Sequence, residues 1–153
     1  MFIKLKHLRK LEENTSSQYA LIGDLVFSAR ELQTASGKID FVQLGCPHCT
    51  LNQIAQVAAL LEYKKLHKDV TFWVCTSATA KTLADRIGYT KTIEKARGQL
   101  VIDTCIDEPC WIAYKQKIGM TDSPKCACYR RYKDVIVGRL KDCVDAAVRG
   151  EWK

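Results

Sequence analysis

The sequence lacks any long apolar run, and its start lacks the apolar stretch of a secretory signal. Nothing in the 153 residues approaches the roughly 20 apolar residues that cross a membrane as a helix. The first residues turn charged by Lys6. There is also no internal repeat and no low-complexity segment. These features predict a protein of the cytoplasm, which is a reducing compartment, with no membrane partner.

The eight cysteines lack the spacing of a zinc ribbon or a zinc finger. The close pairs are Cys46 with Cys49 and Cys126 with Cys128, and neither has a second pair at zinc-site distance. In a secreted protein, eight cysteines would indicate a disulfide framework. In a reducing compartment we expect buried apolar residues, metal ligands or reactive thiols instead.

The charge is not balanced, because 24 Lys and Arg residues stand against 17 Asp and Glu residues, a formal net charge of +7. A nucleic-acid surface would fit this excess, but the aromatic residues do not alternate with the basic ones in an RNA-binding motif. A solvated surface and a preference for anionic substrates account for the charge equally well. Nucleic acid is therefore not the expected partner.

The chain divides into a charged lead-in, residues 1–20, and one domain over residues 21–153. Apolar residues at helical spacing predict helices over residues 24–34, 51–61, 79–87, 91–96 and 140–148. Apolar, β-branched and aromatic runs predict strands over residues 39–44, 70–75, 100–102 and 135–137. Thr50 and Gln53 form a possible capping box at one helix start, and Gly88 ends another helix.

Strands that alternate with helices predict an α/β fold, a three-layer parallel sheet with helices on both faces. Such sheets bind ligands outside the carboxyl ends of their strands. The segments that follow the predicted strands are Gly45-Cys46-Pro47-His48, Thr76-Ser77 and Asp103-Thr104-Cys105. All three contain side chains capable of chemistry, so we expect a site at this edge.

Cys46 follows a strand and precedes a helix start, a position that lowers the pKa of a thiol and suits a metal ligand or nucleophile. His48 is able to bind a metal, a carboxylate or a substrate hydroxyl. The alternative is a buried cysteine beside a capping histidine. Asp103, Thr104 and Cys105 repeat the arrangement at another strand end, and two thiols at two strand ends can converge on one metal.

The remaining polar groups allow two interpretations each. Thr76 and Ser77 precede a helix, where their hydroxyls would bind an anionic group or cap the helix. Ser123-Pro124-Lys125 places a hydroxyl near an ammonium. That pairing would lower the serine pKa or bind a carboxylate, or it would simply form a surface turn.

The order of these motifs resembles the aconitase X family. The resemblance is carried by Leu44-Gly45-Cys46-Pro47-His48, then Thr76-Ser77, then Asp103-Thr104-Cys105, then Thr121-x-Ser123-x-Lys125, and by the C-terminal stretch 140–150 with Trp152. It covers roughly residues 20–152. It implies an aconitase-like domain, similar to the C-terminal domain of the large subunit in relatives that dehydrate phosphomevalonate or cis-3-hydroxyproline.

The resemblance also implies roles. A hydroxy acid would be dehydrated with an iron–sulfur cluster or mononuclear iron, held in part by Cys46 and Cys105. Ser123, as a candidate base, Lys125 and His48 would be catalytic. Substrate would be bound by Thr76, Ser77, Asp103 and Thr104. The partners implied are a small anionic hydroxy acid, an N-terminal domain, and a small swivelling subunit or domain.

Several residues depart from the family pattern. Ala78 stands where an arginine is expected, and Pro124 where a small residue is expected, which leaves the substrate open. Cys126 or Cys128 is available as a substitute ligand. Two other interpretations stay open: a binding or assembly module without catalysis, and a thiol redox role for Cys46 and Cys49.

Overall fold

The computed structural model describes residues 37–104, 117–129 and 135–152. The charged lead-in and the predicted helix over residues 24–34 lie outside these ranges, as does Cys105. In the described ranges no helix has the length and apolar character that a membrane span requires.

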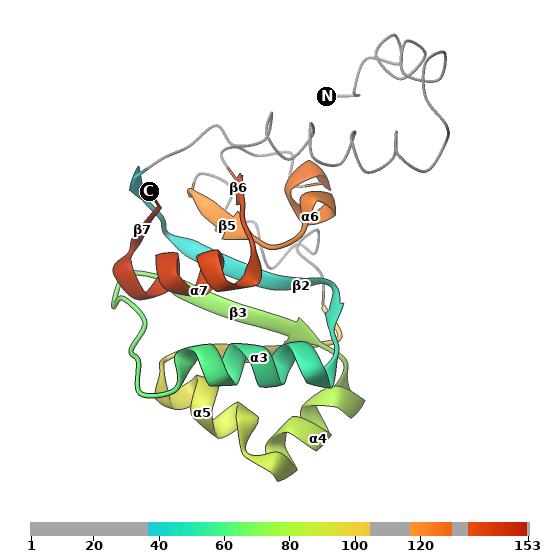
Figure 1. The fold of residues 1–153 in the computed structure, drawn as a ribbon. Helices are drawn as coiled ribbons and strands as arrows, with labels where there is room; N and C mark the ends of the chain where they lie inside the picture. The colour runs from blue at the N-terminus through green and yellow to red at the C-terminus, as the bar shows by residue number, and fades with distance from the viewer. Residues whose placement is uncertain (1–36, 105–116, 130–134, 153) are drawn as a thin grey trace, which may run out of the picture.

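The centre of the fold is a five-stranded parallel sheet (Figure 1) with the strand order β4-β3-β2-β5-β6. Its strands are β2 (Phe41–Cys49), β3 (Thr71–Thr76), β4 (Gln99–Ile102), β5 (Gly119–Thr121) and β6 (Val135–Val137). The helices are α3 (Leu51–Leu61), α4 (Ala78–Ile87), α5 (Tyr89–Lys95), α6 (Pro124–Tyr129) and α7 (Leu140–Arg149). A separate antiparallel pair joins β1 (Gly37–Lys38) to β7 (Glu151–Trp152).

Alternate residues of the strands point to opposite faces of the sheet. On one face, residues such as Val42, Val74 and Met120 share a core with buried residues of α3, α4, α5 and α7. On the other face, Phe41 and Trp73 pack with Cys126 of α6. The predicted three-layer α/β fold, with helices on both faces, is confirmed.

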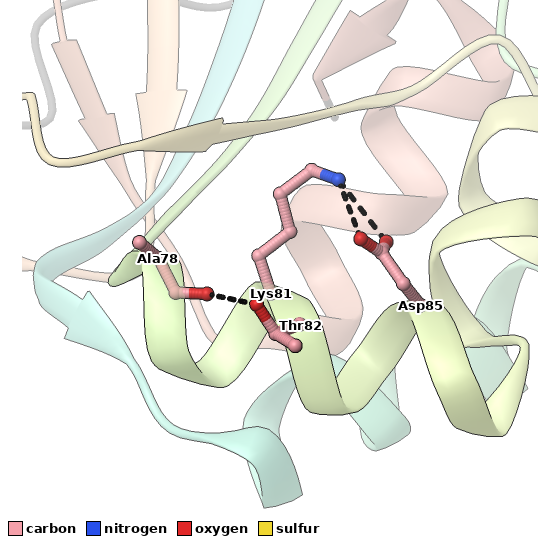
Figure 2. A network of polar contacts seen from close by, with 4 residues as sticks. All are labelled: Ala78, Lys81, Thr82 and Asp85. Atoms are coloured by element: carbon pink, nitrogen blue, oxygen red, sulfur yellow. Dashed lines mark hydrogen bonds and ion pairs between the residues drawn. The ribbon is translucent and has the colours of Figure 1, made fainter.

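Two helix caps predicted from the sequence are present, one at the start of α3 and one at the end of α4. The Thr50 hydroxyl accepts a hydrogen bond from the Gln53 N–H at 3.3 Å, and the Gln53 side chain accepts one from the Thr50 N–H at 2.9 Å. Gly88 ends α4 with a φ of +96°, a left-handed conformation that glycine adopts without strain. Along α4, Lys81 forms an ion pair with Asp85 on the exposed surface (Figure 2).

Several elements differ from the sequence prediction. The strand expected to end at residue 44 continues to Cys49, and β5 and α6 were not predicted at all. β5 is only three residues long and begins with Gly119, whose missing side chain leaves room for the Phe41 ring: an added Cβ would lie 1.9 Å from it. Packing against a neighbouring strand, rather than local periodicity, therefore defines β5.

Candidate functional site

A loop within β2 projects at the carboxyl edge of the sheet. Leu44 pairs with Val74 and Cys49 pairs with Thr76, so the four residues 45–48 stand opposite the single β3 residue between these pairs. The excess residues must leave the plane of the ladder, as in a β-bulge. We call residues 45–48 the Cys46 loop. Cys46 is half-buried within it, whereas Pro47 and His48 are exposed.

Glycine is required where this loop begins. Gly45 has a φ of +91°, and a Cβ added there would lie 2.2 Å from the Cys75 carbonyl oxygen and 3.0 Å from the Cys49 backbone nitrogen. Both contacts involve backbone atoms, which cannot rotate away. The missing side chain of Gly45 thus permits a close backbone approach, which brings the loop directly against β3. The peptide bond between Cys46 and Pro47 is cis.

The junction between β5 and α6 contacts the Cys46 loop. The Ser123 hydroxyl donates a hydrogen bond to the Cys46 carbonyl oxygen at 2.5 Å and accepts one from the Cys126 N–H at 3.1 Å. Burial raises the pKa of Asp122 above its ordinary value, although the N–H groups of Asp122 itself and of Gly45 donate to its carboxylate and act in the opposite direction. The loop is therefore held by a carboxylate and a hydroxyl from adjacent residues.

The ends of β3 and β4 meet beside the same loop. The His48 Nε2 atom lies 3.0 Å from the Thr104 carbonyl oxygen. The Ser77 hydroxyl caps α4 by accepting the Ala80 N–H, and the Asp103 carboxylate accepts the Ala78 N–H at 3.2 Å. The start of α4 thus already has an anion beside it, supplied by the chain itself.

Thr76 lies inside the protein, not on the site surface. Its side chain is fully buried, and its hydroxyl donates to the Cys49 carbonyl oxygen at 2.7 Å. Phe72, Val74 and Thr76 alternate along β3, so all three face the main core. In this arrangement Thr76 supports the Cys46 loop from behind and is not presented to a ligand.

The described thiols differ in environment. Cys46 packs at the edge of the Phe41–Trp73–Cys126 cluster, whereas Cys49 belongs to the main core on the other face of the sheet. Burial, followed by the nearby charges of Asp122 and Cys75, raises the pKa of Cys49 to about 12. Five thiols are free of disulfides: those of Cys46, Cys49, Cys75, Cys126 and Cys143. The separation of Cys46 and Cys49 disfavours the thiol redox interpretation.

The described residues do not by themselves form a complete metal site. In the ranges that the structure covers, no three His, Cys, Asp or Glu side chains are grouped to hold a metal ion. Cys46 is half-buried at the site edge and has suitable chemistry for iron. Cys49 keeps its proton and lies in the core. A thiolate site at this edge would therefore combine Cys46 with ligands from outside the described residues.

Sequence reasoning missed two polar residues at this site, Asp122 and Gln43. Asp122 lies inside the Thr121-x-Ser123-x-Lys125 motif, and it would have been noticed had β5 been predicted. Gln43 is buried in β2; its side chain donates to the Cys75 sulfur at 3.4 Å and accepts from the Cys126 thiol at 3.6 Å. An amide in the middle of an apolar strand run was the available signal.

Comparisons with known proteins agree on one family. The family model described as "Aconitase X third domain" matches residues 39–149. A "Phosphomevalonate dehydratase large subunit" of Methanocaldococcus jannaschii is 50% identical over 76 residues, which are 50% of this chain and 18% of that protein. A "Cis-3-hydroxy-L-proline dehydratase" of Pseudomonas aeruginosa is 35% identical over 131 residues, covering 79% of this chain and 22% of that protein.

The fold also matches a solved structure from the same family. The crystal structure of Thermococcus kodakaraensis aconitase X in its holo-form superposes with a TM-score of 0.71 and 29% identity. That match covers 82% of this chain and 33% of the other. The chain therefore spans about a fifth to a third of the length of the relatives it matches.

Proposed function

Because this chain belongs to the aconitase X family, we propose that it contributes one wall of the active site of a hydro-lyase that dehydrates a small anionic hydroxy acid. One observation carries the proposal. The Cys46 loop, the ends of β3 and β4, and the start of α6 bring residues from separate parts of the sequence to one edge of the sheet. Related dehydratases share this domain.

The metal in this proposal is held by Cys46 together with Cys105, which follows the described end of β4 by three residues. Iron, as a cluster or as a single ion, would supply a Lewis acid for the leaving hydroxyl. Further ligands would come from other parts of the enzyme. Cys46 suits this role because it is half-buried at the edge of the sheet.

Catalytic roles are proposed for Ser123, Lys125 and His48. Lys125 is exposed in the first turn of α6 and would attract the anionic group of the substrate. His48 is exposed beside Thr104 and would contact the substrate hydroxyl. To act as a base, Ser123 would have to exchange its present donation to the Cys46 carbonyl oxygen for one toward the substrate.

Substrate contacts are proposed for Ser77, Asp103 and Thr104, with Thr76 behind them. The Asp103 carboxylate already occupies the start of α4. An anionic group would therefore be repelled there, and we place the anionic end of the substrate toward Lys125 instead. Asp103 would then orient a substrate hydroxyl or amine.

The proposal includes partners, because the chain is much shorter than its relatives. An N-terminal domain and a small swivelling subunit or domain would supply the missing contacts and close the site. We also propose that the chain works in the cytoplasm, where the thiol of Cys46 stays reduced.

The test uses the complete enzyme, purified without oxygen, with Cys46→Ser and Cys105→Ser compared with the unsubstituted protein. We expect both variants to lose iron and dehydratase activity together. Cys143→Ala is the matched control: it also removes a thiol, but from the buried face of α7, and it should retain iron. If iron content and dehydration both survive in the Cys46→Ser and Cys105→Ser variants, the proposal is wrong.

A second candidate function is a binding or assembly module without catalysis. The small number of metal donors favours this function. Within the covered ranges, Cys46 is the one thiol at the site edge, and no three side chains are grouped to hold a metal ion. Turnover by the isolated chain would exclude this function. Tight binding to a partner without turnover, in the chain alone and in the assembly, would support it.

A further inference from the structure

Two adjacent residues hold both ends of the Gly45–Cys46 unit. The Gly45 N–H faces the Asp122 carboxylate and opposes the rise in its pKa that burial causes, and the Ser123 hydroxyl donates a hydrogen bond to the Cys46 carbonyl oxygen. We propose that Asp122 and Ser123 are positioning residues that fix the Cys46 loop to the start of α6 and so aim the Cys46 thiol. The importance of this positioning for catalysis rests on the proposed function. The positioning itself does not depend on that function.

The loop needs such partners because it leaves the sheet. Backbone N–H and C=O groups that leave a ladder must find other hydrogen-bonding groups when they lie inside a protein. Gly45 is itself buried, pressed against the Cys75 carbonyl oxygen of β3. A carboxylate is an acceptor and a hydroxyl is a donor, so Asp122 and Ser123 match the N–H and the C=O that each one meets.

The junction that supplies these groups is itself firmly placed. Within it, the Ser123 N–H donates to the Thr121 hydroxyl at 3.2 Å, and the Ala127 N–H donates to the Ser123 carbonyl oxygen at 3.1 Å. Thr121 is the last residue of β5 and lies in register with Gln43 of β2. A shift of α6 would therefore move the Cys46 loop with it.

The buried amide of Gln43 adds a second connection between α6 and the sheet. Gln43 bonds at one end to the Cys126 thiol of α6 and at the other to the Cys75 sulfur of β3. Cys126 thus touches both the Gln43 amide and, through its N–H, the Ser123 hydroxyl. These bonds leave α6 little freedom to turn, which is what a positioning element requires.

Two roles for Ser123 can now be separated. A base acts on substrate, and its loss lowers turnover without altering the Cys46 thiol. A positioning residue acts on Cys46, and its loss alters the reactivity of that thiol even when neither iron nor substrate is present. The Cys46 thiol in the metal-free chain therefore distinguishes the two roles.

The experiment measures the rate at which iodoacetamide alkylates Cys46 in the metal-free 153-residue chain, followed by peptide mass analysis. Loss of one hydrogen bond opens a local structure about two- to twelvefold more often. We expect Ser123→Ala and Asp122→Ala each to raise the Cys46 rate by about that factor. Ser123→Thr and Asp122→Asn, which keep a hydroxyl and an acceptor oxygen, should restore the rate.

Asp142→Ala is the matched control. It removes the carboxylate that accepts the Arg139 N–H at the start of α7, at 3.2 Å, so it weakens a helix start that is not part of the β5–α6 junction. Its Cys46 rate should equal that of the unsubstituted chain. A rate in folded Ser123→Ala and Asp122→Ala no higher than in this control would overturn the proposal.

Amide hydrogen exchange of Gly45 in the unsubstituted chain tests the proposal without any substitution. The Gly45 N–H should be protected; exchange at the rate of an open peptide would also overturn the proposal. Failure of the iron proposal shows separately, as retained iron in Cys46→Ser, and leaves the alkylation result unaffected. If Ser123→Ala lowers turnover but leaves the alkylation rate of Cys46 unchanged, Ser123 acts as a base and the positioning role is excluded.

Discussion

Replacing Gly45 by alanine should destabilise the domain more than the same change at a glycine with a similar positive φ. Gly45 has a φ of +91°, and the added Cβ would lie 2.2 Å from the Cys75 carbonyl oxygen. Gly88 has a φ of +96°, but a Cβ added there meets nothing within 4 Å. The two substitutions share the backbone strain, and only the first adds a collision.

The expected sizes follow from these two terms. A side chain in the left-handed region costs about 1–2 kcal/mol, and this is all that we expect for Gly88→Ala. Forcing a methyl group into a packed backbone contact costs about 1–3 kcal/mol more. Gly45→Ala should therefore lower the free energy of unfolding by about 2–5 kcal/mol. The gain from a stiffer unfolded chain is common to both variants and cancels in their difference.

The measurement is urea unfolding of the two variants and the unsubstituted chain, followed by circular dichroism. Equal losses of stability in Gly45→Ala and Gly88→Ala would refute the close approach of the Cys46 loop to β3. An unchanged slope of free energy against urea would show that the comparison concerns the folded state.

Two further predictions concern titrating groups. Cys49, whose pKa burial raises to about 12, should resist iodoacetamide in the folded chain at mildly alkaline pH while half-buried Cys46 reacts, and equal labelling of the two would contradict this. Asp145 has its pKa lowered chiefly by the hydrogen bond from Lys141, so its contribution to stability is present above the unfolded value of about 3.9 and is lost as pH falls through the lower folded value. Asp145→Asn should cost at most about 1 kcal/mol at neutral pH and progressively less in acid; a loss that does not change with pH in denaturant unfolding would argue against it.

The regular part of the fold was predictable because local pattern and tertiary packing agree there. The helix over residues 51–61 has a capping box and one apolar face, and the structure has both. β3 is rich in β-branched and aromatic residues and is buried along almost its whole length. In such segments the local preference of the chain and its position in the sheet favour the same structure.

The sequence predicts the location of the site at the sheet edge, but not the contacts between its residues. Ligands bind at the carboxyl ends of parallel strands, and this rule correctly predicts that His48, Ser77 and Asp103 lie at one edge of the sheet. The shape of the Cys46 loop depends on its register with β3, which is a relation between two strands and leaves no periodic signal in either. Asp122 was missed for the same reason, since β5 is defined by its neighbours.

Thr76 is buried although it follows a predicted strand end. Its hydroxyl suggested a ligand contact, yet it shares the alternation of Phe72 and Val74, both of which face the core. A polar side chain at the end of a buried strand can form a hydrogen bond to the protein backbone as readily as to a substrate. Here its hydroxyl donates to the Cys49 carbonyl oxygen and so satisfies a buried backbone group.

The small β1–β7 pair has a consequence for how this domain connects to a larger protein. Gly37 pairs with Trp152, and Lys38 with Glu151, so the two ends of the described domain lie side by side (Figure 1). Chain arriving before residue 37 and chain leaving after residue 152 therefore attach at one point. A domain tethered in this way can be excised, transplanted into a surface loop of another protein, or circularly permuted by a short linker between its ends, because none of these changes moves the sheet edge that carries Cys46.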